Sequence, residues 1–185
     1  MGLIIEDGKG TGQTAGVNSE NMLLTKCVTE ETQQHVNEVE GESFSIVIDR
    51  ATDGGNQQFF YMKNESDKDL FVTSIKGFVS ADTEIKVLLG VTGTATSATD
   101  IVPVNRNAGK GEQLSGDFQI GNDLSMTGGD TVDLIKFIDG GTDSQGSVKF
   151  SWGSTLILPK NSTFCLESSA AATINLTISC YLHSH

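Results

Sequence analysis

The stretch "ATINLTISCYLH", residues 172–183, carries the clearest structural signal in the chain. Apolar residues occupy every second position, and polar residues together with one tyrosine fill the positions between them. The first set is Ile174, Leu176, Ile178, Cys180 and Leu182; the second is Thr173, Asn175, Thr177, Ser179 and Tyr181. Because successive side chains of a β-strand point to opposite faces of the sheet, this pattern predicts a long strand with one buried face.

The same alternation recurs through most of the chain. In "SFSIVID", residues 43–49, every second residue from Phe44 to Ile48 is large and apolar. Turns rich in Gly, Asn and Asp separate roughly nine or ten such segments, a spacing typical of a sandwich or barrel. We therefore predict an all-β fold, a jelly-roll-like β-sandwich spanning residues 41–185. Stretches with strand-like character between these two are "QQFFYMK", "LFVTSIKGFVS", "TEIKVLLGV", "IVPVNRN", "DFQIGNDLSM", "TVDLIKFI", "SVKFSW", "STLILPK" and "TFCLES", of which neighbouring ones can belong to one strand.

One stretch, "EETQQHVNEVE" at residues 30–40, is compatible with a single turn of helix. Its only apolar residues are Val36 and Val39, which form too narrow a stripe for a helix to dock on a sheet. We expect this turn to be a polar connector ahead of the sandwich.

The composition agrees with a single β-rich domain. The chain has 185 residues, of which 37% are hydrophobic and only 19% are charged, with 21 glycines. A chain of this length is long enough for one domain with a hydrophobic core but short for two such domains. Ser, Thr, Asn and Gly replace the missing charged residues, and these residues are poor helix formers that favour turns and sheets.

The net charge of -12 and the single, scattered Lys and Arg residues disfavour nucleic acid and anionic membrane as partners. No window approaches the length of apolar sequence that a membrane span needs. The opening "MGLIIEDGKG" lacks the pattern of a signal peptide. We therefore expect a protein that is made in the host cytoplasm, is not secreted, and binds neither nucleic acid nor membrane.

Residues 1–40 are predicted to form an extended, glycine-rich arm and a first strand. The stretch "EDGKGTGQTAG", Glu6 to Gly16, partly matches the glycine-rich motif of a phosphate-binding loop. However, Lys9 is followed by glycine where a P-loop has Ser or Thr, and no helix pattern follows to hold a pyrophosphate. Glu6 and Asp7 would also repel a phosphate. We interpret the segment as an arm and predict no cofactor.

No residue pattern predicts catalysis. Cys165 and Cys180 lie in apolar stretches and are expected to be small core residues, and the odd count with Cys27 fits neither a disulfide framework nor a zinc site. The three histidines lie in polar or terminal positions and are expected to be solvated, and no nucleophile elbow is present. These histidines are His35, His183 and His185.

Two acidic stretches leave calcium binding open as an alternative. "EVEGE" would place three carboxylates on one face if it were extended, and "DGGTDSQG" places two in a tight loop. Neither has the spacing of a calcium loop, so plain turns are preferred and no metal site is predicted. The residues concerned are Glu38, Glu40 and Glu42 in the first stretch, and Asp139 and Asp143 in the second.

Two segments resemble small virion structural proteins of tailed bacteriophages. In those proteins a glycine-rich opening leads into V-N-S-x-N-x-L, an A/C-V-T strand and a short N-x-x-x-G segment, and a later T-G-T connector precedes P-V-N-x-N-x-G. The matching positions are Val17 to Asn21, Leu24, Cys27 to Thr29, Asn37 to Gly41, Thr92 to Thr94, and Pro103 to Gly109. The match covers the first 50 or so residues well and the middle loosely. Met22 and Cys27 depart from the residues usual in that family.

The resemblance implies a non-enzymatic protein of the virion, with a jelly-roll or related sandwich that assembles as a homo-oligomer, often a trimer. The expected function is capsid decoration, in which the protein binds the major capsid protein or another virion protein and braces neighbouring subunits through its arm. Arms of this kind can add a strand to the edge of a neighbour's sheet. The predicted partner-binding residues are Leu3, Ile4, Ile5, Val17, Asn18, Asn21, Leu23, Leu24 and Val28.

Two alternatives remain open at this stage. A tail, neck or fibre-base component could use the same arm, although no long repeat or coiled coil points to a fibre. A carbohydrate-binding jelly-roll module would need exposed aromatic residues on loops, whereas Trp152 and Tyr61 fall inside predicted strands.

Overall fold

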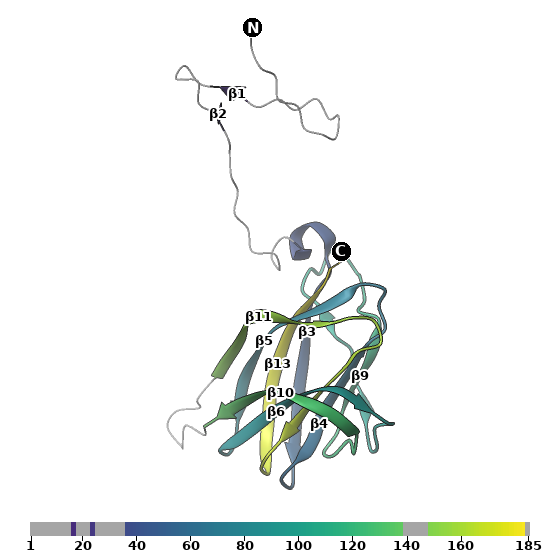
Figure 1. The fold of residues 1–185 in the computed structure, drawn as a ribbon, viewed down its shortest axis with the longest axis vertical. Coiled ribbons are helices and arrows are strands. Elements are labelled where there is room, and N and C mark those ends of the chain that lie inside the picture. Colours follow the sequence, from purple (N-terminus) through teal and green to yellow (C-terminus); the bar gives the residue numbers. More distant parts are fainter. Residues whose placement is uncertain (1–15, 18–22, 25–35, 139–147, 184–185) are drawn as a thin grey trace. The chain divides into compact units, whose positions relative to one another are not determined.

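The structure is a computed structural model of the chain, and it describes residues 16–17, 23–24, 36–138 and 148–183. The chain divides into two units, residues 1–31 and residues 32–185. Figure 1 labels many of the elements described below. In the first unit, β1 (Gly16–Val17) pairs antiparallel with β2 (Leu23–Leu24). The second unit, called the body below, holds all the other described elements.

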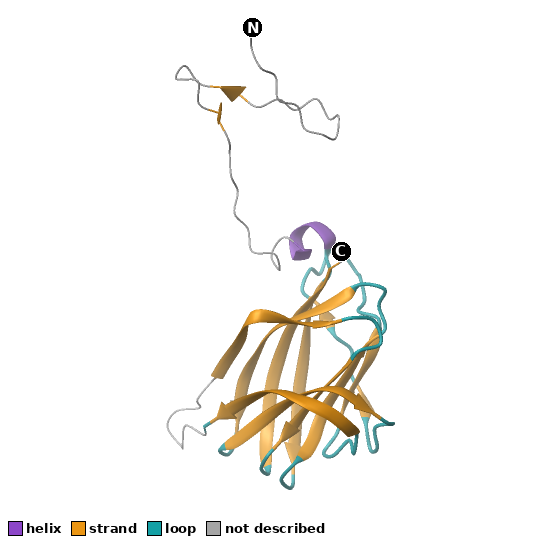
Figure 2. Cartoon of the chain, in the orientation of Figure 1, coloured by secondary structure: helices purple, strands orange, loops and turns teal. Residues whose placement is uncertain are grey.

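The body is built from two antiparallel sheets, which Figure 1 shows as two layers, and Figure 2 shows that strands make up most of it. The chain is therefore nearly all β, as predicted. The six-stranded sheet has the order β10 (Thr127–Phe137), β6 (Thr83–Thr92), β12 (Thr163–Ser168), β4 (Gln57–Asn64), β9 (Gly116–Ile120), β7 (Thr99–Asp100). The five-stranded sheet has the order β11 (Val148–Leu158), β5 (Asp69–Val79), β13 (Ala172–His183), β3 (Ser43–Thr52), β8 (Val104–Asn105).

The eight long strands pair in nested sequence order, the first with the last, the second with the second-last, and so on. β3 pairs with β13, β4 with β12, β5 with β11, and β6 with β10, each antiparallel. The first and third of these pairs lie in one sheet, and the second and fourth lie in the other. The long connection between β6 and β10 contributes β7, β8 and β9, which extend the free edges of both sheets.

The main core lies between the two sheets, and the alternation that predicted β13 and β3 is confirmed. Ile174, Ile178 and Cys180 are fully buried, as are Phe44 and Ile46 on the neighbouring strand. Aromatic rings fill the centre, where Phe60 and Phe164 meet edge to face with 6.1 Å between their centroids. Because burying a large apolar side chain contributes about 2–3 kcal/mol, this core is the main stabilising feature of the body.

The helical turn predicted at residues 30–40 docks on the body, contrary to expectation. It forms η1 (Val36–Glu40), and Val36 is buried against Phe71 and Tyr181 on the outer face of the five-stranded sheet. These two rings stack with 5.0 Å between centroids. One valine therefore suffices, because it meets an aromatic platform and needs no apolar stripe of its own. The Val36 carbonyl accepts a 2.8 Å hydrogen bond from the Gly41 amide, which closes the turn.

A second small cluster covers the outer face of the six-stranded sheet. Tyr61, Leu88 and Cys165 point outward there and are covered by Leu124 and Met126 from the β6–β10 connection. The Gln58 side chain holds this cover in place, because its Oε1 accepts a 2.6 Å hydrogen bond from the Met126 amide. Both sheets thus have an outer face that is partly closed by the chain itself.

Cys165 and Cys180 are confirmed as buried free thiols, and we expect neither to react in the folded protein. Burial raises the pKa of both from 9.0 to about 12, since a thiolate in the core would lose its solvation. Iodoacetamide at about pH 8 should leave both unmodified until guanidinium unfolds the chain, as peptide mass spectrometry would measure. The proton held in the folded state also stabilises it below pH 9, and this contribution is lost as the pH rises from 9 to about 12. Rapid labelling without denaturant would contradict the burial.

Candidate functional site

The predicted partner-binding residues fall mostly outside the described residues. Three of them are placed: Val17 in β1, and Leu23 and Leu24 in β2. Val17 lies opposite Leu23, and Gly16 lies opposite Leu24. The predicted residues outside the described part of the chain are Leu3, Ile4, Ile5, Asn18, Asn21 and Val28.

Each sheet of the body has two edge strands, and a strand from another chain could pair with the sheet only there. On one side, two short strands cover the edges. β7 and the residue after it bind β9, with a 2.9 Å bond from the Ile101 amide to the Phe118 carbonyl. β8 covers the first residues of β3, and the Arg106 amide bonds the Ser43 carbonyl at 2.8 Å. Short edge strands limit pairing with other chains.

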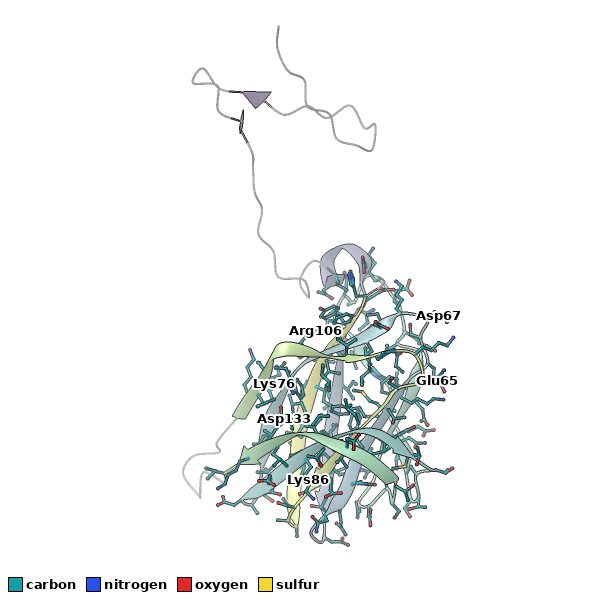
Figure 3. All side chains as sticks on the ribbon, in the orientation of Figure 1. Glu65, Asp67, Lys76, Lys86, Arg106 and Asp133 are labelled. Carbon is teal, nitrogen blue, oxygen red and sulfur yellow. The ribbon has the colours of Figure 1, made fainter. Side chains whose placement is uncertain are left out.

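The opposite edges, β10 and β11, are both interrupted by bulges. The register of β10 shifts between Thr131 and Asp133, and that of β11 shifts between Ser151 and Leu156. The two interruptions are joined, because Trp152 Nε1 donates a 3.0 Å hydrogen bond to Asp133 Oδ2. Figure 3 labels Asp133 on β10. Since a bulge twists an edge away from regular pairing, these two strands are poor templates for strand addition.

Single apolar side chains remain exposed on the body. Val132 and Leu134 lie along β10, and Val47 lies on the outer face of β3, each about half exposed. Scattered apolar residues of this kind are normal on a protein surface. The four sheet edges are each shortened, bulged or partly covered, so the body presents no long flat edge among its described strands.

A polar pocket of about 440 Å³ lies where the β3–β4 turn meets the loops beside β7 and β9. One of its lining residues is Arg50, which is half-buried and has the same parity on β3 as the core residues Phe44, Ile46 and Ile48. The buried Nε of Arg50 has no hydrogen-bond partner among the described residues. The pocket is lined by Arg50, Asp53, Gln57, Ser97, Thr99, Gly121, Asn122 and Asp123.

The walls of this polar pocket are fixed by hydrogen bonds. Gln57 Oε1 accepts bonds from the amides of Asp53 and Gly54 at 2.9 and 3.0 Å, and its Nε2 donates to Asp53 Oδ1 at 2.7 Å. On the other wall, Asp123 Oδ1 accepts a 3.0 Å bond from the Ser125 amide. Each of these two aspartates therefore has one carboxylate oxygen engaged in the wall.

A smaller, more apolar pocket of about 320 Å³ opens near the far ends of β6 and β11. Leu89 and Val91 form one side of it, and Ile157 and Leu158 form the other. No charged residue lines it, so it offers shape and apolar surface but no group that would fix a polar ligand.

The acidic and histidine candidates are placed differently from the predictions. The stretch "EVEGE" is not extended, because Glu40 ends η1 and the Glu42 carboxylate instead accepts bonds from Lys68 Nζ at 2.5 and 2.7 Å. His183 is half-buried, not solvated, and its ring meets Phe71 edge-on at 6.0 Å. His35, His185, Cys27, Asp139 and Asp143 lie outside the described residues. Over residues 36–138 and 148–183, no three His, Cys, Asp or Glu side chains gather as a metal site would require.

One carboxylate has a perturbed pKa. The pKa of Asp117 on β9 is raised because burial disfavours its charged form and because Asp100 and Glu65 lie nearby. Asp100 comes from the edge strand β7, so the crowding of these carboxylates follows from the pairing of β7 with β9. Burial first, and then the nearby carboxylates, account for the raised pKa of Asp117, and the shift marks no catalytic group by itself.

The polar pocket was not predicted from the sequence, although one signal for it is present. In β3 the apolar positions 44, 46 and 48 are followed by Arg50, a charged residue at an inward-facing position. A charge that continues a buried face is unusual, and it marks the point where that face opens towards solvent. The loop residues of the pocket gave no signal, because their proximity depends on the tertiary fold.

The described part of the chain contains no helix that is long and apolar enough to cross a membrane. Comparison of the chain with protein-family models, with curated protein sequences and with solved structures finds no match to any of them.

Proposed function

We propose that this chain is a non-enzymatic structural protein of a virion, most simply a capsid decoration protein that binds the outside of the head. The resemblance of its first 50 or so residues to such proteins supports this reading. The observation that carries it is the division of the chain: a body with its own core at residues 32–185 and a separate unit at residues 1–31. That division suits an arm that binds a neighbour while the body stays rigid.

We further propose that the body is a jelly roll. The support is the pairing of the eight long strands from the outside of the chain inward, with successive pairs alternating between the two sheets. A long hairpin folded over in this way produces the two Greek keys of that architecture. Folds of this kind serve many functions, so the topology is compatible with a virion protein but does not by itself indicate one.

The mechanism we propose is strand donation by the arm, not strand acceptance by the body. The edges of the body are short, bulged or partly covered, so a neighbour's strand finds little to pair with. The arm, in contrast, carries an apolar run at residues 3–5 and a strand-like stretch at residues 23–28, and either can add to a sheet edge on the partner. Leu23 and Leu24 already pair with β1, so addition there would extend a two-stranded unit.

The proposed partner is the major capsid protein or another virion protein, and the proposed assembly is a homo-oligomer, with a trimer preferred. Several arms on one oligomer would bind neighbouring subunits together, and avidity would turn weak contacts into stable attachment. The net charge of -12 would keep unassembled copies soluble in the host cytoplasm and apart from nucleic acid.

The copy number of this chain per purified virion tests the proposal. For a head decoration protein we expect on the order of hundreds of copies, because it follows the symmetry of the capsid lattice. Quantitative mass spectrometry against the major capsid protein measures the ratio. About three to twelve copies would favour the alternative, a tail, neck or fibre-base component with cyclic symmetry. Absence from the particles would overturn both.

A further inference from the structure

We propose that the outer face of the five-stranded sheet binds residues 3–7 of a second copy of this chain. The proposal names one contact of the homo-oligomer proposed above, and so it rests on that part of the proposed function. The same apolar run is proposed to bind the virion, so docking between copies belongs to the unassembled protein. The contact lies on a face of the sheet and does not use its short or bulged edges.

The middle of this outer face carries a shallow groove with apolar side chains beside it. Val36 covers one end of the face, and Leu124 and Met126 cover part of the other sheet. The groove, of about 310 Å³, lies on strands β3, β13 and β5, and Val47 and Phe78 line it. Val47 is 59% exposed. A single exposed valine is normal on a surface, but beside a groove it gives an incoming apolar side chain a place to pack.

Two lysines stand side by side on the same face. Lys76 on β5, labelled in Figure 3, lines the groove and lies directly opposite Lys149 on β11, and both are exposed. Like charges at directly opposed positions of a sheet are destabilising. Neither lysine forms an ion pair with any described residue. Four other lysines of the body do pair with a carboxylate, namely Lys63, Lys68, Lys86 and Lys160. In a chain of net charge -12, this lysine pair fits a partner that brings carboxylates.

The arm contains the complement of this surface. Leu3, Ile4 and Ile5 are followed directly by Glu6 and Asp7. Strands β3, β13, β5 and β11 lie in this order across the sheet, so the four span about 14 Å at about 4.8 Å between neighbours. Five residues in extended form would span about 13 Å. A segment laid across the strands can therefore place its apolar residues over the groove and its carboxylates over the lysine pair.

The charges on the face fix the direction of the docked segment. Asp49 is exposed on β3, two strands away from Lys76. Carboxylates are therefore attracted to the β5–β11 side and repelled from the β3 side. Two lysines on a chain of net charge -12 are too few to hold nucleic acid or an anionic membrane, so an acidic protein segment is the partner that fits.

Sedimentation equilibrium of the full chain tests the proposal without virions. We expect reversible self-association with a dissociation constant on the order of 10–100 µM. The contact is expected to be this weak because it consists of a few apolar side chains and two exposed ion pairs.

Charge reversal locates the contact. Lys76→Glu together with Lys149→Glu is expected to raise the dissociation constant at least about tenfold, because two attractions become repulsions. Glu6→Lys together with Asp7→Lys should have the same effect from the other side of the contact. The chain with all four substitutions keeps the net charge of -12 and should self-associate like the parent. Lys136→Glu, at an exposed position of β10 in the other sheet, should leave self-association unchanged.

Three results would overturn the proposal. These are a chain that stays monomeric up to about 200 µM, self-association that reversal of the lysine pair leaves unchanged, and failure of the quadruple variant to recover it. Thermal unfolding of each variant checks that the body folds. If a lysine variant fails to fold, Glu6→Lys with Asp7→Lys decides alone, because neither residue belongs to the body. A monomeric chain would overturn this contact only, since the copy number per virion tests the virion proposal separately.

Discussion

Removal of residues 1–31 is expected to abolish binding to the virion while leaving the body folded. All residues of the described core clusters lie between Val36 and Leu182, so the truncation removes none of them. We expect the free energy of unfolding of the body to change by less than about 1 kcal/mol. Binding to particles stripped of the protein should fall by at least about a hundredfold, because the arm supplies the proposed contacts and their avidity. Co-sedimentation with particles measures the binding, and chemical denaturation measures the stability.

Matched substitutions separate the arm from the body in this experiment. Replacing Leu3, Ile4 and Ile5 by serine should reproduce most of the loss without any deletion. Replacing the exposed Val132 and Leu134 of β10 by threonine should have no effect, because the bulged edge is not a proposed contact. Binding of the truncated chain with unchanged affinity would show that the arm is not the attachment element, and loss of binding on β10 substitution would move the contact to the body.

The sheet-forming parts of the chain could be predicted because a strand buried on one face has apolar and polar residues in alternation. β13 and β3 coincide with the alternating stretches from which they were predicted. The prediction left the strand boundaries open where a strand is irregular. Two neighbouring stretches, "SVKFSW" and "STLILPK", form the single strand β11, since the bulge between Ser151 and Leu156 interrupts the alternation without ending the strand.

The connection between β6 and β10 was the least predictable part of the body. "IVPVNRN" was predicted as a strand, but only Val104 and Asn105 pair, as β8. The chain passes here from the six-stranded sheet, which holds β7, to the five-stranded sheet, which holds β8. Pro103 lies at the crossing and lacks an amide donor for a ladder. A local sequence pattern does not record such a change of sheet.

For the candidate sites too, features within one segment of the chain could be predicted, whereas features formed by several segments could not. The arm was predicted from composition and resemblance, and its proposed contacts remain predictions. The polar pocket was not predicted, because Arg50, Thr99 and Asp123 come together only when three segments meet in space. The docking of Val36 was likewise missed, since its platform joins Phe71 and Tyr181 from neighbouring strands that are distant in the sequence.

Replacing Asn64 by leucine is expected to destabilise the body by about 3–5 kcal/mol, although leucine has nearly the same size. Asn64 ends β4 and is fully buried. Its Nδ2 donates to the carbonyls of Lys68 and Leu158 at 2.9 and 2.8 Å, and its Oδ1 accepts from the Ser66 amide at 3.0 Å. The side chain therefore shapes the β4–β5 turn and joins the two sheets, because Leu158 ends β11 in the opposite sheet. Urea denaturation of the variant measures the loss.

The expected loss is large because leucine cannot form hydrogen bonds. Three backbone groups, the carbonyls of Lys68 and Leu158 and the amide of Ser66, would lose their partner at once. Two of these groups belong to a turn that water reaches only in part. Asn175→Leu provides the control, because Asn175 lies on the outer face of β13 and is only half-buried. We expect that variant to stay within about 0.5 kcal/mol of the parent. Equal stability of the two variants would mean that water satisfies the turn once Asn64 is gone, and that the core alone holds the sheets together.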